Sequence, residues 1–407
     1  MGRDEAEQEV FLNRSEFPVM PHIQVVGTTG AGKGVVMGVL AAQWLLSGES
    51  VFMLDPKDDE WGPHVYAQAS REAGVPHHYI NLREHVPQFS LFDGASVDDI
   101  EELLIAGFGL TEVGGSADYY TLADRKYAGI IARVIASEGL TPAEAYMKNA
   151  KTLEKESAKF AGKLRELGEV EAINVAAGHG ISFADIIENG GSCYIVGSMR
   201  VEKIVRLQKM ILIRLMQIAE KRDRIGTSLR PVAIVLDEVK YHLSRTSLEA
   251  LGAARDKGVH VVLAHQSVSD LYDVAANLKG QAVEGAVVEN CKVKICYRVQ
   301  NPETAEWLAK MSGTVLVDDE TRKVTRNLAL AEHVESDRTI RQSERYFIDE
   351  NMMLNLPNGV AAVYGLGTAG FVYVRNLKTE KRAENVQVKP ALGASVTSTA
   401  IKIEDLI

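Results

Sequence analysis

The 407-residue sequence predicts an α/β fold, in which a largely parallel sheet is covered by helices on both faces. Three observations carry this prediction: short apolar runs that recur along the chain, a glycine-rich turn directly after the first run, and a long helical stretch after the second. Runs that are apolar on both faces are typical of parallel strands buried between two layers of helices. The expected strands are residues 23–26, 51–55, 193–197, 232–237, 259–264 and 292–297.

The first strand leads into a phosphate-binding motif. In "GTTGAGKG", Gly27, Gly32 and Lys33 match G-x-x-x-x-G-K-[ST]. The glycines let backbone N–H groups turn inward, the following helix points its N-terminus at a phosphate, and Lys33 can reach the β- and γ-phosphates. A glycine-rich turn that binds nothing is the disfavoured alternative, because strand, spacing and lysine all agree. The candidate nucleotide-binding residues are Gly27, Thr28, Thr29, Gly30, Ala31, Gly32, Lys33, Gly34 and Val35.

Gly34 departs from this motif. A Ser or Thr at that position normally ligates Mg²⁺ directly, and glycine offers no side-chain oxygen. Thr28 and Thr29 carry hydroxyls in the same loop, but at the wrong offset. The metal could instead be held by phosphate oxygens, water and a nearby acid. The sequence therefore predicts nucleotide binding and leaves the rate of hydrolysis open.

The second strand ends in Asp55, Pro56 and Lys57, and ligands in open α/β sheets sit beyond the carboxyl ends of strands. Asp55 could lie behind a metal ligand or cap the turn that Pro56 stiffens, and we favour the cap. Between the second and third expected strands the chain lacks a strand pattern and carries helix-start signals, including the capping boxes Ser96/Asp99 and Thr141/Glu144.

An all-α domain is therefore expected within the α/β fold. The expected division is a nucleotide-binding domain in two parts, residues 1–94 and 179–375, an all-α insertion at 95–178, and a C-terminal tail at 376–407. The tail is polar and is expected to be mobile or docked on a neighbour. Just before it, residues 360–366 and 370–374 are expected to form an antiparallel pair.

Four residues of the second half are candidates for catalysis. The apolar run 232–236 ends in Asp237 and Glu238, a pair able to hold Mg²⁺ and to activate water, although such a strand end is common without function. Gln266 follows the next strand and could sense the γ-phosphate, or be an ordinary polar residue. Arg255 precedes that strand and could reach a neighbouring subunit's nucleotide, or be a surface arginine.

Charge and composition limit the function classes. The net charge of −10 argues against a generally basic nucleic-acid-binding surface but leaves room for a local basic channel. Residues 200–224 hold eight Lys or Arg and three Asp or Glu, as in a solvated helix face or a helix lining a DNA-facing pore. The three cysteines form no C-x-x-C pair, which fits a reducing cytoplasm. The sequence shows neither an apolar run long enough to span a bilayer nor an N-terminal secretory signal.

The order of the motifs resembles a known family. "GTTGAGKG", "LDPKDDEW", "GSMRVEKIVRLQKMILIRL", "IVLDEVKYH", "AARDKGVHVVLAHQSVSDL" and "NCKVKICYRVQNPETAEWLAKMSGT" resemble the cytoplasmic part of type IV coupling proteins (TraD/TraG-like), within the FtsK/HerA group of RecA-type ring ATPases. The resemblance covers about residues 22–374 and implies a RecA-like P-loop NTPase sheet with an all-α domain at 95–178. It implies an ATPase that uses ATP and Mg²⁺.

By that resemblance, Lys33 is the phosphate-loop lysine, Asp237 the metal residue with Glu238 activating water, Gln266 the sensor-strand glutamine and Arg255 the arginine before that strand. It also implies homo-hexameric rings that bind single- or double-stranded DNA, relaxase or effector proteins through the all-α domain, and secretion-channel proteins. The expected location is cytoplasmic, at the inner face of the bacterial inner membrane. Gly34 departs from the family. The family's N-terminal membrane anchor is not found in this sequence either, so the chain is expected to be a truncated or an unanchored version, or to have its anchor on a partner.

Three functions follow from these observations. The leading one is an ATP-driven coupling protein that hands DNA, or DNA with bound protein, to a secretion or conjugation channel. The alternative that Gly34 favours is a nucleotide-gated recruitment platform for protein substrates with weak or no hydrolysis. The third, a DNA-processing translocase without a secretion partner, is disfavoured by the all-α insertion.

Overall fold

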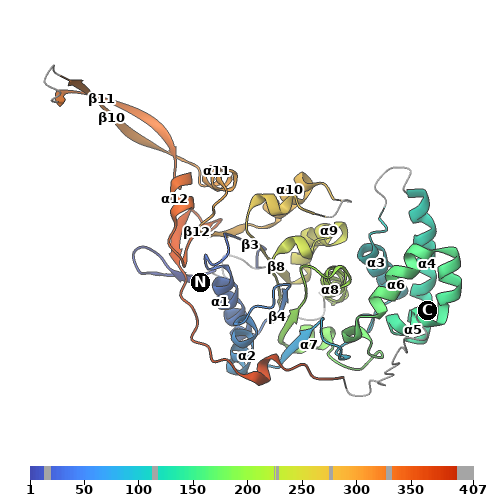
Figure 1. The fold of residues 1–407 in the computed structure, drawn as a ribbon. Helices are drawn as coiled ribbons and strands as arrows, with labels where there is room; N and C mark the ends of the chain where they lie inside the picture. The colour runs from blue at the N-terminus through green and yellow to red at the C-terminus, as the bar shows by residue number, and fades with distance from the viewer. Residues whose placement is uncertain are drawn as a thin grey trace.

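A large sheet forms the centre of the molecule (Figure 1). The structure is a computed structural model that describes residues 1–12, 20–111, 118–223, 225, 229–274, 278–326 and 332–391. Within these residues, eleven strands join in the order β2-β1-β13-β12-β9-β3-β8-β7-β4-β6-β5. The parallel part consists of β3 (Ile23–Val26), β4 (Ser50–Asp55), β5 (His77–Asn81), β6 (Gly191–Val196), β7 (Val232–Leu236), β8 (Val259–His265) and β9 (Val293–Cys296).

The expected α/β fold is confirmed, and every expected strand is present in it. β12 (Val360–Tyr364) and β13 (Gly370–Tyr373) form the expected antiparallel pair. They extend the sheet beyond β9, and β1 (Gly2–Arg3) and β2 (Glu9–Val10) follow β13 to complete this edge of the sheet. The expectation that no strand lies between the second and third runs is wrong, because β5 lies there.

Successive residues of the central strands face opposite layers. Val51 and Met53 pack with α1 (Lys33–Leu46) and α2 (Gly62–Ala73), whereas Phe52 and Leu54 face the opposite layer. That second layer contains α7 (Phe183–Asn189), α8 (Glu202–Glu220), α9 (Arg245–Ala254) and α10 (Gly280–Asn290). Near β9 and β12, a smaller core includes α11 (Pro302–Met311) and α12 (Glu350–Asn355). The alternation explains why the strand sequences are apolar throughout.

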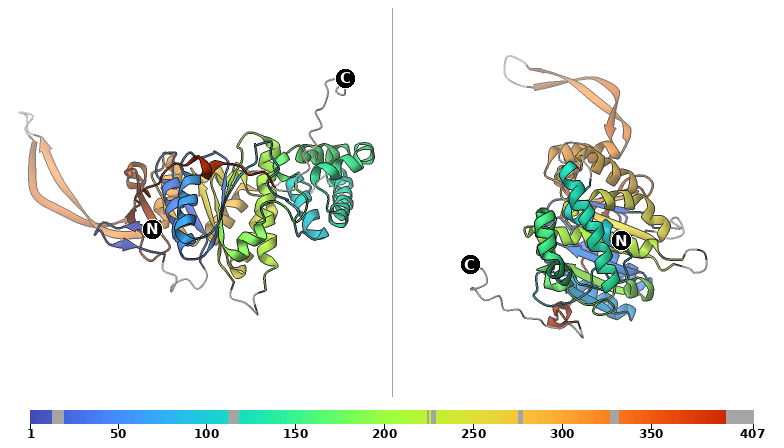
Figure 2. Two further views of the ribbon diagram at one scale, coloured as in Figure 1. Left: turned by 90° about the horizontal axis from the view of Figure 1, so that it is seen from below. Right: turned by 90° about the vertical axis from the view of Figure 1, so that its right-hand side faces the viewer.

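Four helices form a group at one end of the molecule (Figures 1 and 2). They are α3 (Val97–Phe108), α4 (Asp118–Glu138), α5 (Pro142–Glu156) and α6 (Ala158–Gly168), called the helical group below. Ser96 with Asp99 and Thr141 with Glu144 both form capping boxes. Buried residues of the helical group, such as Leu103 and Phe160, belong to the same apolar cluster as one face of the sheet. The helical group is therefore packed onto the sheet rather than isolated from it.

α8, which is largely buried, makes up most of the described part of the basic stretch 200–224. Several of its cations pair with acids of the helical group: Arg206 lies 2.8 Å from Glu166, and Lys203 lies 3.0 Å from Glu169. At the other end, Asp99 pairs with Lys221 and lies 3.9 Å from Arg214. Four cations of this stretch therefore attach it to its neighbours, and the expectation of a fully solvated face is wrong.

Arg222, directly after α8, binds a second part of the chain. Its guanidinium donates to the carbonyl oxygens of Arg230, at 2.6 Å, and Lys257. Lys257 ends a short 3₁₀ turn, η3 (Arg255–Lys257), that precedes β8. The C-terminal end of α8 is in this way attached to the turn that carries Arg255.

Two further features lie outside the sequence expectations. β10 (Thr314–Arg326) and β11 (Glu332–Tyr346) form an antiparallel hairpin that projects away from the main sheet (Figures 1 and 2). The described part of the expected tail, called the C-terminal segment (residues 376–391), lies along its own chain. Asn385 is buried there, accepting a hydrogen bond from Arg71 at 2.9 Å and contacting His64 Nδ1 at 3.1 Å.

Candidate nucleotide-binding site

The glycine-rich loop after β3 has a backbone that requires glycine. Gly27, Gly30 and Gly32 all have positive φ, at 155°, 77° and 127°. A Cβ on Gly32 would lie 2.7 Å from the ring of Tyr297, and one on Gly27 would lie 2.7 Å from Tyr297 Cβ. The loop is fixed at its start, where Thr28 N–H donates to the Arg298 carbonyl at 2.9 Å. Because α1 begins at Lys33 directly behind this turn, its first N–H groups face the loop.

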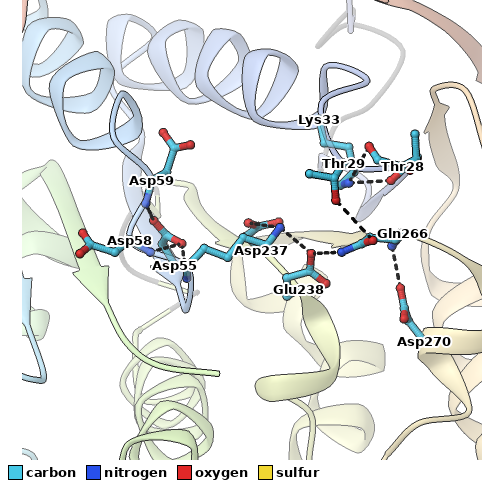
Figure 3. A network of polar contacts seen from close by, with 12 residues as sticks. Thr28, Thr29, Lys33, Asp55, Asp58, Asp59, Asp237, Glu238, Gln266 and Asp270 are labelled. Atoms are coloured by element: carbon cyan, nitrogen blue, oxygen red, sulfur yellow. Dashed lines mark hydrogen bonds and ion pairs between the residues drawn. The ribbon is translucent and has the colours of Figure 1, made fainter. Parts of the chain in front are cut away.

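Lys33 is buried inside the loop. Its ammonium donates to the carbonyl oxygens of Gly27, at 2.6 Å, and Thr28, at 3.3 Å (Figure 3). Burial lowers the pKa of Lys33, and the nearby positive charge of Lys57 lowers it further. The loop therefore holds its lysine on backbone oxygens at the position from which a phosphate would be contacted.

The acidic pair Asp237 and Glu238 lies at the carboxyl end of β7, as expected. Both side chains are buried, and Glu238 has the left-handed backbone φ of 49°. Burial raises the pKa of Asp237 despite the opposing charge of Lys57. Burial would also raise the pKa of Glu238, but hydrogen bonds from Lys57 and Gln266, with the charges of Lys57 and Lys33, outweigh it and lower that pKa.

Gln266 joins the acidic pair to the loop. Its side-chain amide donates to Glu238 Oε1 at 2.7 Å, and its Oε1 lies 3.5 Å from the Thr29 hydroxyl. Asp270 holds the backbone in place by accepting from the Gln266 N–H at 2.8 Å. Figure 3 shows Lys33, Thr29, Gln266 and Glu238 around one space. The carboxyl ends of β3, β7 and β8 thus bring together residues that are more than 200 positions apart in sequence.

Lys57 is the site residue that sequence analysis did not assign. Its ammonium lies 3.1 Å from Asp237 Oδ2 and 2.5 Å from Glu238 Oε1. The neighbouring carboxylate of Asp55 organises the turn, accepting the N–H groups of Lys57 and Asp59 at 2.8 and 2.7 Å and the Tyr194 hydroxyl at 2.7 Å. The preferred reading of Asp55 as a turn cap agrees with this geometry. The missing signal was the strand order, which places β4 beside β7.

Gly34 is open to substitution. It is the second residue of α1 and has no positive φ. Among the described residues, no heavy atom outside the local helix backbone lies within 4 Å of the position that a Cβ would take. The absence of a hydroxyl is therefore not imposed by packing, and a serine would fit.

The loop and Asp237 line a common cavity of about 360 Å³, and Glu238 lies outside its lining. Lys33, Gly34, Lys57 and Asp237 line it together with Tyr194 and residues of α1 and α2. Asp237 Oδ1 is buried and has no hydrogen-bond partner among the described residues. That orphaned oxygen, next to the phosphate loop, fits a hydrated Mg²⁺ carried by a nucleotide, which needs only one or two carboxylates. The described residues contain no cluster of three or more His, Cys, Asp or Glu that could hold a metal unaided.

Arg255 lies away from this cleft. It begins the turn η3 before β8, whereas Gln266 follows the end of β8. A seven-residue strand is about 23 Å long at roughly 3.3 Å per residue, so Arg255 is at the opposite edge of the sheet. The structure brings together Lys33, Asp237, Glu238 and Gln266, but not Arg255.

Comparisons with known proteins support the resemblance. A family model described as "TraM recognition site of TraD and TraG" matches residues 231–357. Mobilization protein A of Escherichia coli is 29% identical over 340 residues, which are 79% of this chain and 59% of that protein. This chain therefore spans less than two thirds of that curated relative.

Solved structures show the same fold. The bacterial conjugative coupling protein TrwBdeltaN70 aligns with a TM-score of 0.66 at 17% identity, covering 90% of this chain and 86% of that one. VirB4 of Thermoanaerobacter pseudethanolicus aligns with a TM-score of 0.58 at 13% identity, covering 95% and 97%. TrwB has also been solved with ADP and Mg²⁺, at a TM-score of 0.61 and 18% identity, covering 89% and 87%.

Together these matches confirm the resemblance to type IV coupling proteins and the RecA-like P-loop NTPase fold, and the FtsK/HerA grouping is consistent with them. In the described part of the chain, none of the helices has the length and apolar character needed to cross a bilayer.

Proposed function

We propose that this chain is an ATP-driven coupling protein that moves DNA, or DNA with bound protein, toward a conjugation or type IV secretion channel. The observation that carries the proposal is that Lys33 and Asp237 line one cavity at the glycine-rich loop, next to Glu238 and its hydrogen-bond partner Gln266. The solved relative that holds ADP and Mg²⁺ supports ATP and Mg²⁺ as the ligands.

Each residue has a role that follows from its position. The loop N–H groups and Lys33 bind the phosphates, and Asp237 offers its unpartnered Oδ1 to the hydrated metal, which would neutralise charge on the phosphates. Glu238 accepts the proton of the attacking water, and Gln266 holds that carboxylate by its hydrogen bond.

Arg255 is proposed to act on the nucleotide of a neighbouring subunit. Among the described residues that line the cavity there is no arginine, and the printed ion pairs of the acids come from Lys57. Arg255 of the same chain lies at the other end of β8, about 23 Å away at roughly 3.3 Å per residue. A second copy in a homo-hexameric ring would bring its own Arg255 to the open side of the cleft. An arginine supplied in this way raises turnover by orders of magnitude.

Mixed rings test this assignment. Arg255→Ala should spare ATP binding and lower turnover. Mixing Arg255→Ala subunits with Glu238→Gln subunits should restore part of the activity, because some interfaces then pair an intact glutamate with an intact arginine. Normal turnover by Arg255→Ala, or no recovery although mixed rings form, would show that Arg255 does not act in trans.

Relaxosome or effector proteins are proposed as partners, and two regions are candidates for binding them. The helical group is one, and the region matched by the family model, 231–357, which contains the β10–β11 hairpin, is the other. Excising the helical group is a poor test, because it would expose the core shared with the sheet. Replacing 314–346 by a short turn removes a hairpin that pairs only with itself among the described residues. Loss of DNA transfer with retained ATP turnover would assign recognition to the hairpin, and retained transfer would assign it to the helical group.

A nucleotide-gated recruitment platform with little hydrolysis is the second candidate function, and Gly34 favours it. ATP turnover measured with no DNA, with single-stranded DNA and with double-stranded DNA, on a sample of known assembly state, separates the two. Turnover that rises with DNA supports the motor. ATP binding without turnover in assembled rings supports the platform. In either case we propose action at the cytoplasmic face of the inner membrane.

A further inference from the structure

Lys57 compensates two buried negative charges. Asp237 and Glu238 are only 8% and 3% exposed, and within the described residues both of their ion pairs are made by Lys57. Two neighbouring buried carboxylates are costly unless a cation lies between them. The ammonium of Lys57 therefore neutralises the two acids here, as a divalent cation neutralises such acids in a nucleotide-bound site.

The position of Lys57 is built into the fold. The buried Asp55 accepts three backbone N–H groups from the turn, those of Lys57, Asp58 and Asp59, at 2.8, 3.2 and 2.7 Å. Its second oxygen also accepts the Tyr194 hydroxyl, which lies on the neighbouring strand β6. The backbone that carries Lys57 is thus fixed, while its side chain remains 31% exposed to the cavity. Because the four-carbon stem of a lysine is flexible, its ammonium can move from one nearby anion to another while the backbone stays in place.

The two lysines of the cleft have different partners. Lys33 is bonded to loop carbonyls, whereas Lys57 is bonded to the acids, and both line the cavity with Gly34. Gly34 contributes no oxygen, so the metal would depend more heavily on Asp237, whose Oδ2 Lys57 already contacts. Lys57 contacts Oδ2 and the metal would take the unpartnered Oδ1, so the two cations compete for the charge of one carboxylate and repel each other across it.

We propose that Lys57 is an exchangeable counter-ion of the nucleotide site. Without nucleotide it occupies Asp237 and Glu238 and keeps divalent cations from binding there alone. When the metal arrives with a nucleotide, Lys57 leaves the acids and binds the terminal phosphate. The second step rests on the proposed function, whereas the first concerns the nucleotide-free protein and can be tested by itself.

The experiment measures Mn²⁺ binding to the nucleotide-free protein by electron paramagnetic resonance. Lys57→Met should bind Mn²⁺ at least about tenfold more tightly than the wild type. An adjacent positive charge lowers the proton affinity of a carboxylate by at least about tenfold, and we expect its effect on Mn²⁺ affinity to be no smaller. Lys57→Arg should resemble the wild type. Lys240→Met is the matched control, because Lys240 lies two residues after Glu238 but pairs with Asp273, at 2.6 Å. An unchanged Mn²⁺ affinity in Lys57→Met, or an equal rise in Lys240→Met, would overturn the first step.

A second comparison covers the case in which Lys57→Met does not fold. Glu238→Gln removes one buried charge, so Lys57→Met/Glu238→Gln leaves only Asp237 uncompensated. The double variant should bind Mn²⁺ at least about tenfold more tightly than Glu238→Gln alone, for the same reason. Equal affinities would refute the counter-ion role.

The phosphate step is measured with fluorescent ATP and ADP analogues in the presence of Mg²⁺. Lys57→Met should lower the preference for ATP over ADP about tenfold while Lys240→Met leaves it unchanged, because only ATP carries the terminal phosphate that Lys57 binds. A wild-type preference for ATP in Lys57→Met would overturn this step. If the wild type itself bound no nucleotide, the proposed function would fail, while the Mn²⁺ result would still decide the first step.

Discussion

Restoring a hydroxyl at residue 34 tests how the missing ligand limits the site. Gly34→Ser places its side chain in open space on a helical backbone, so we expect no steric cost. Serine is about 0.5 kcal/mol better than glycine inside a helix, so the variant should fold at least as well as the wild type. An added polar contact to a charged group is worth about 1.5–3 kcal/mol, which predicts at least roughly tenfold tighter binding of Mg²⁺-ATP.

Isothermal titration with ATP, once with Mg²⁺ and once with EDTA, is the appropriate assay. The gain should occur only with Mg²⁺, because the hydroxyl acts through the metal. Gly34→Ala is the matched control: it fills the same space and stabilises the helix by about 1 kcal/mol, but adds no oxygen. If alanine tightens binding as much as serine does, the reasoning about the metal ligand is wrong. Turnover that stays unchanged in Gly34→Ser despite tighter binding would favour the recruitment platform.

Three further perturbations follow from the geometry. Gly32→Ala should abolish ATP binding and lower the melting temperature, because its Cβ would meet the Tyr297 ring, whereas Gly30→Ala, with open space and the same backbone sign, should cost only about 1–2 kcal/mol. Asp237→Asn should keep or raise the melting temperature at pH 7 while removing the stabilisation by Mg²⁺-ATP. Burial raises the pKa of the Asp237 carboxyl in the folded protein. The stability that the protonated carboxyl contributes is therefore complete below its pKa in the unfolded chain and is lost as the pH rises through its pKa in the folded protein. A difference in stability between variant and wild type that stays constant across pH 3–7 would contradict this. Asn385→Ala removes a buried hydrogen bond worth about 1–3 kcal/mol, so limited proteolysis should cut residues 376–391 sooner, and equal cleavage rates would show that the segment is held by other contacts.

The elements that sequence predicted best are those whose pattern is local. The central strands are apolar on both faces, and the two capping boxes are complete within four residues, so each could be predicted without its neighbours. β5 reads "HHYIN" and has no such apolar run; its pairing with β6 makes it a strand. The β10–β11 hairpin is rich in charge and was not predicted, because what makes each segment a strand is its pairing with the other.

The candidate site divides in the same way. Lys33 and the Asp237–Glu238 pair stand in recognisable local motifs, and Gln266 ends a predicted strand. Lys57 contacts the acids because β4 lies beside β7, and strand order is a property of the whole sheet that no short pattern contains. Charge counting could not show how α8 is attached, because the acids that pair with Lys203, Arg206 and Lys221 come from α3 and from the end of α6.

The anchoring of α8 has a mechanical consequence. Ion pairs join its first turns to the end of α6 and its last residues to α3. Arg222, directly after it, donates a hydrogen bond to the turn that carries Arg255. Nineteen helical residues make a strut about 28 Å long. A load applied to the helical group would travel along this strut to the edge of the sheet opposite the phosphate loop. Under the function proposed above, a cargo that pulls on the helical group would therefore displace the turn that carries Arg255.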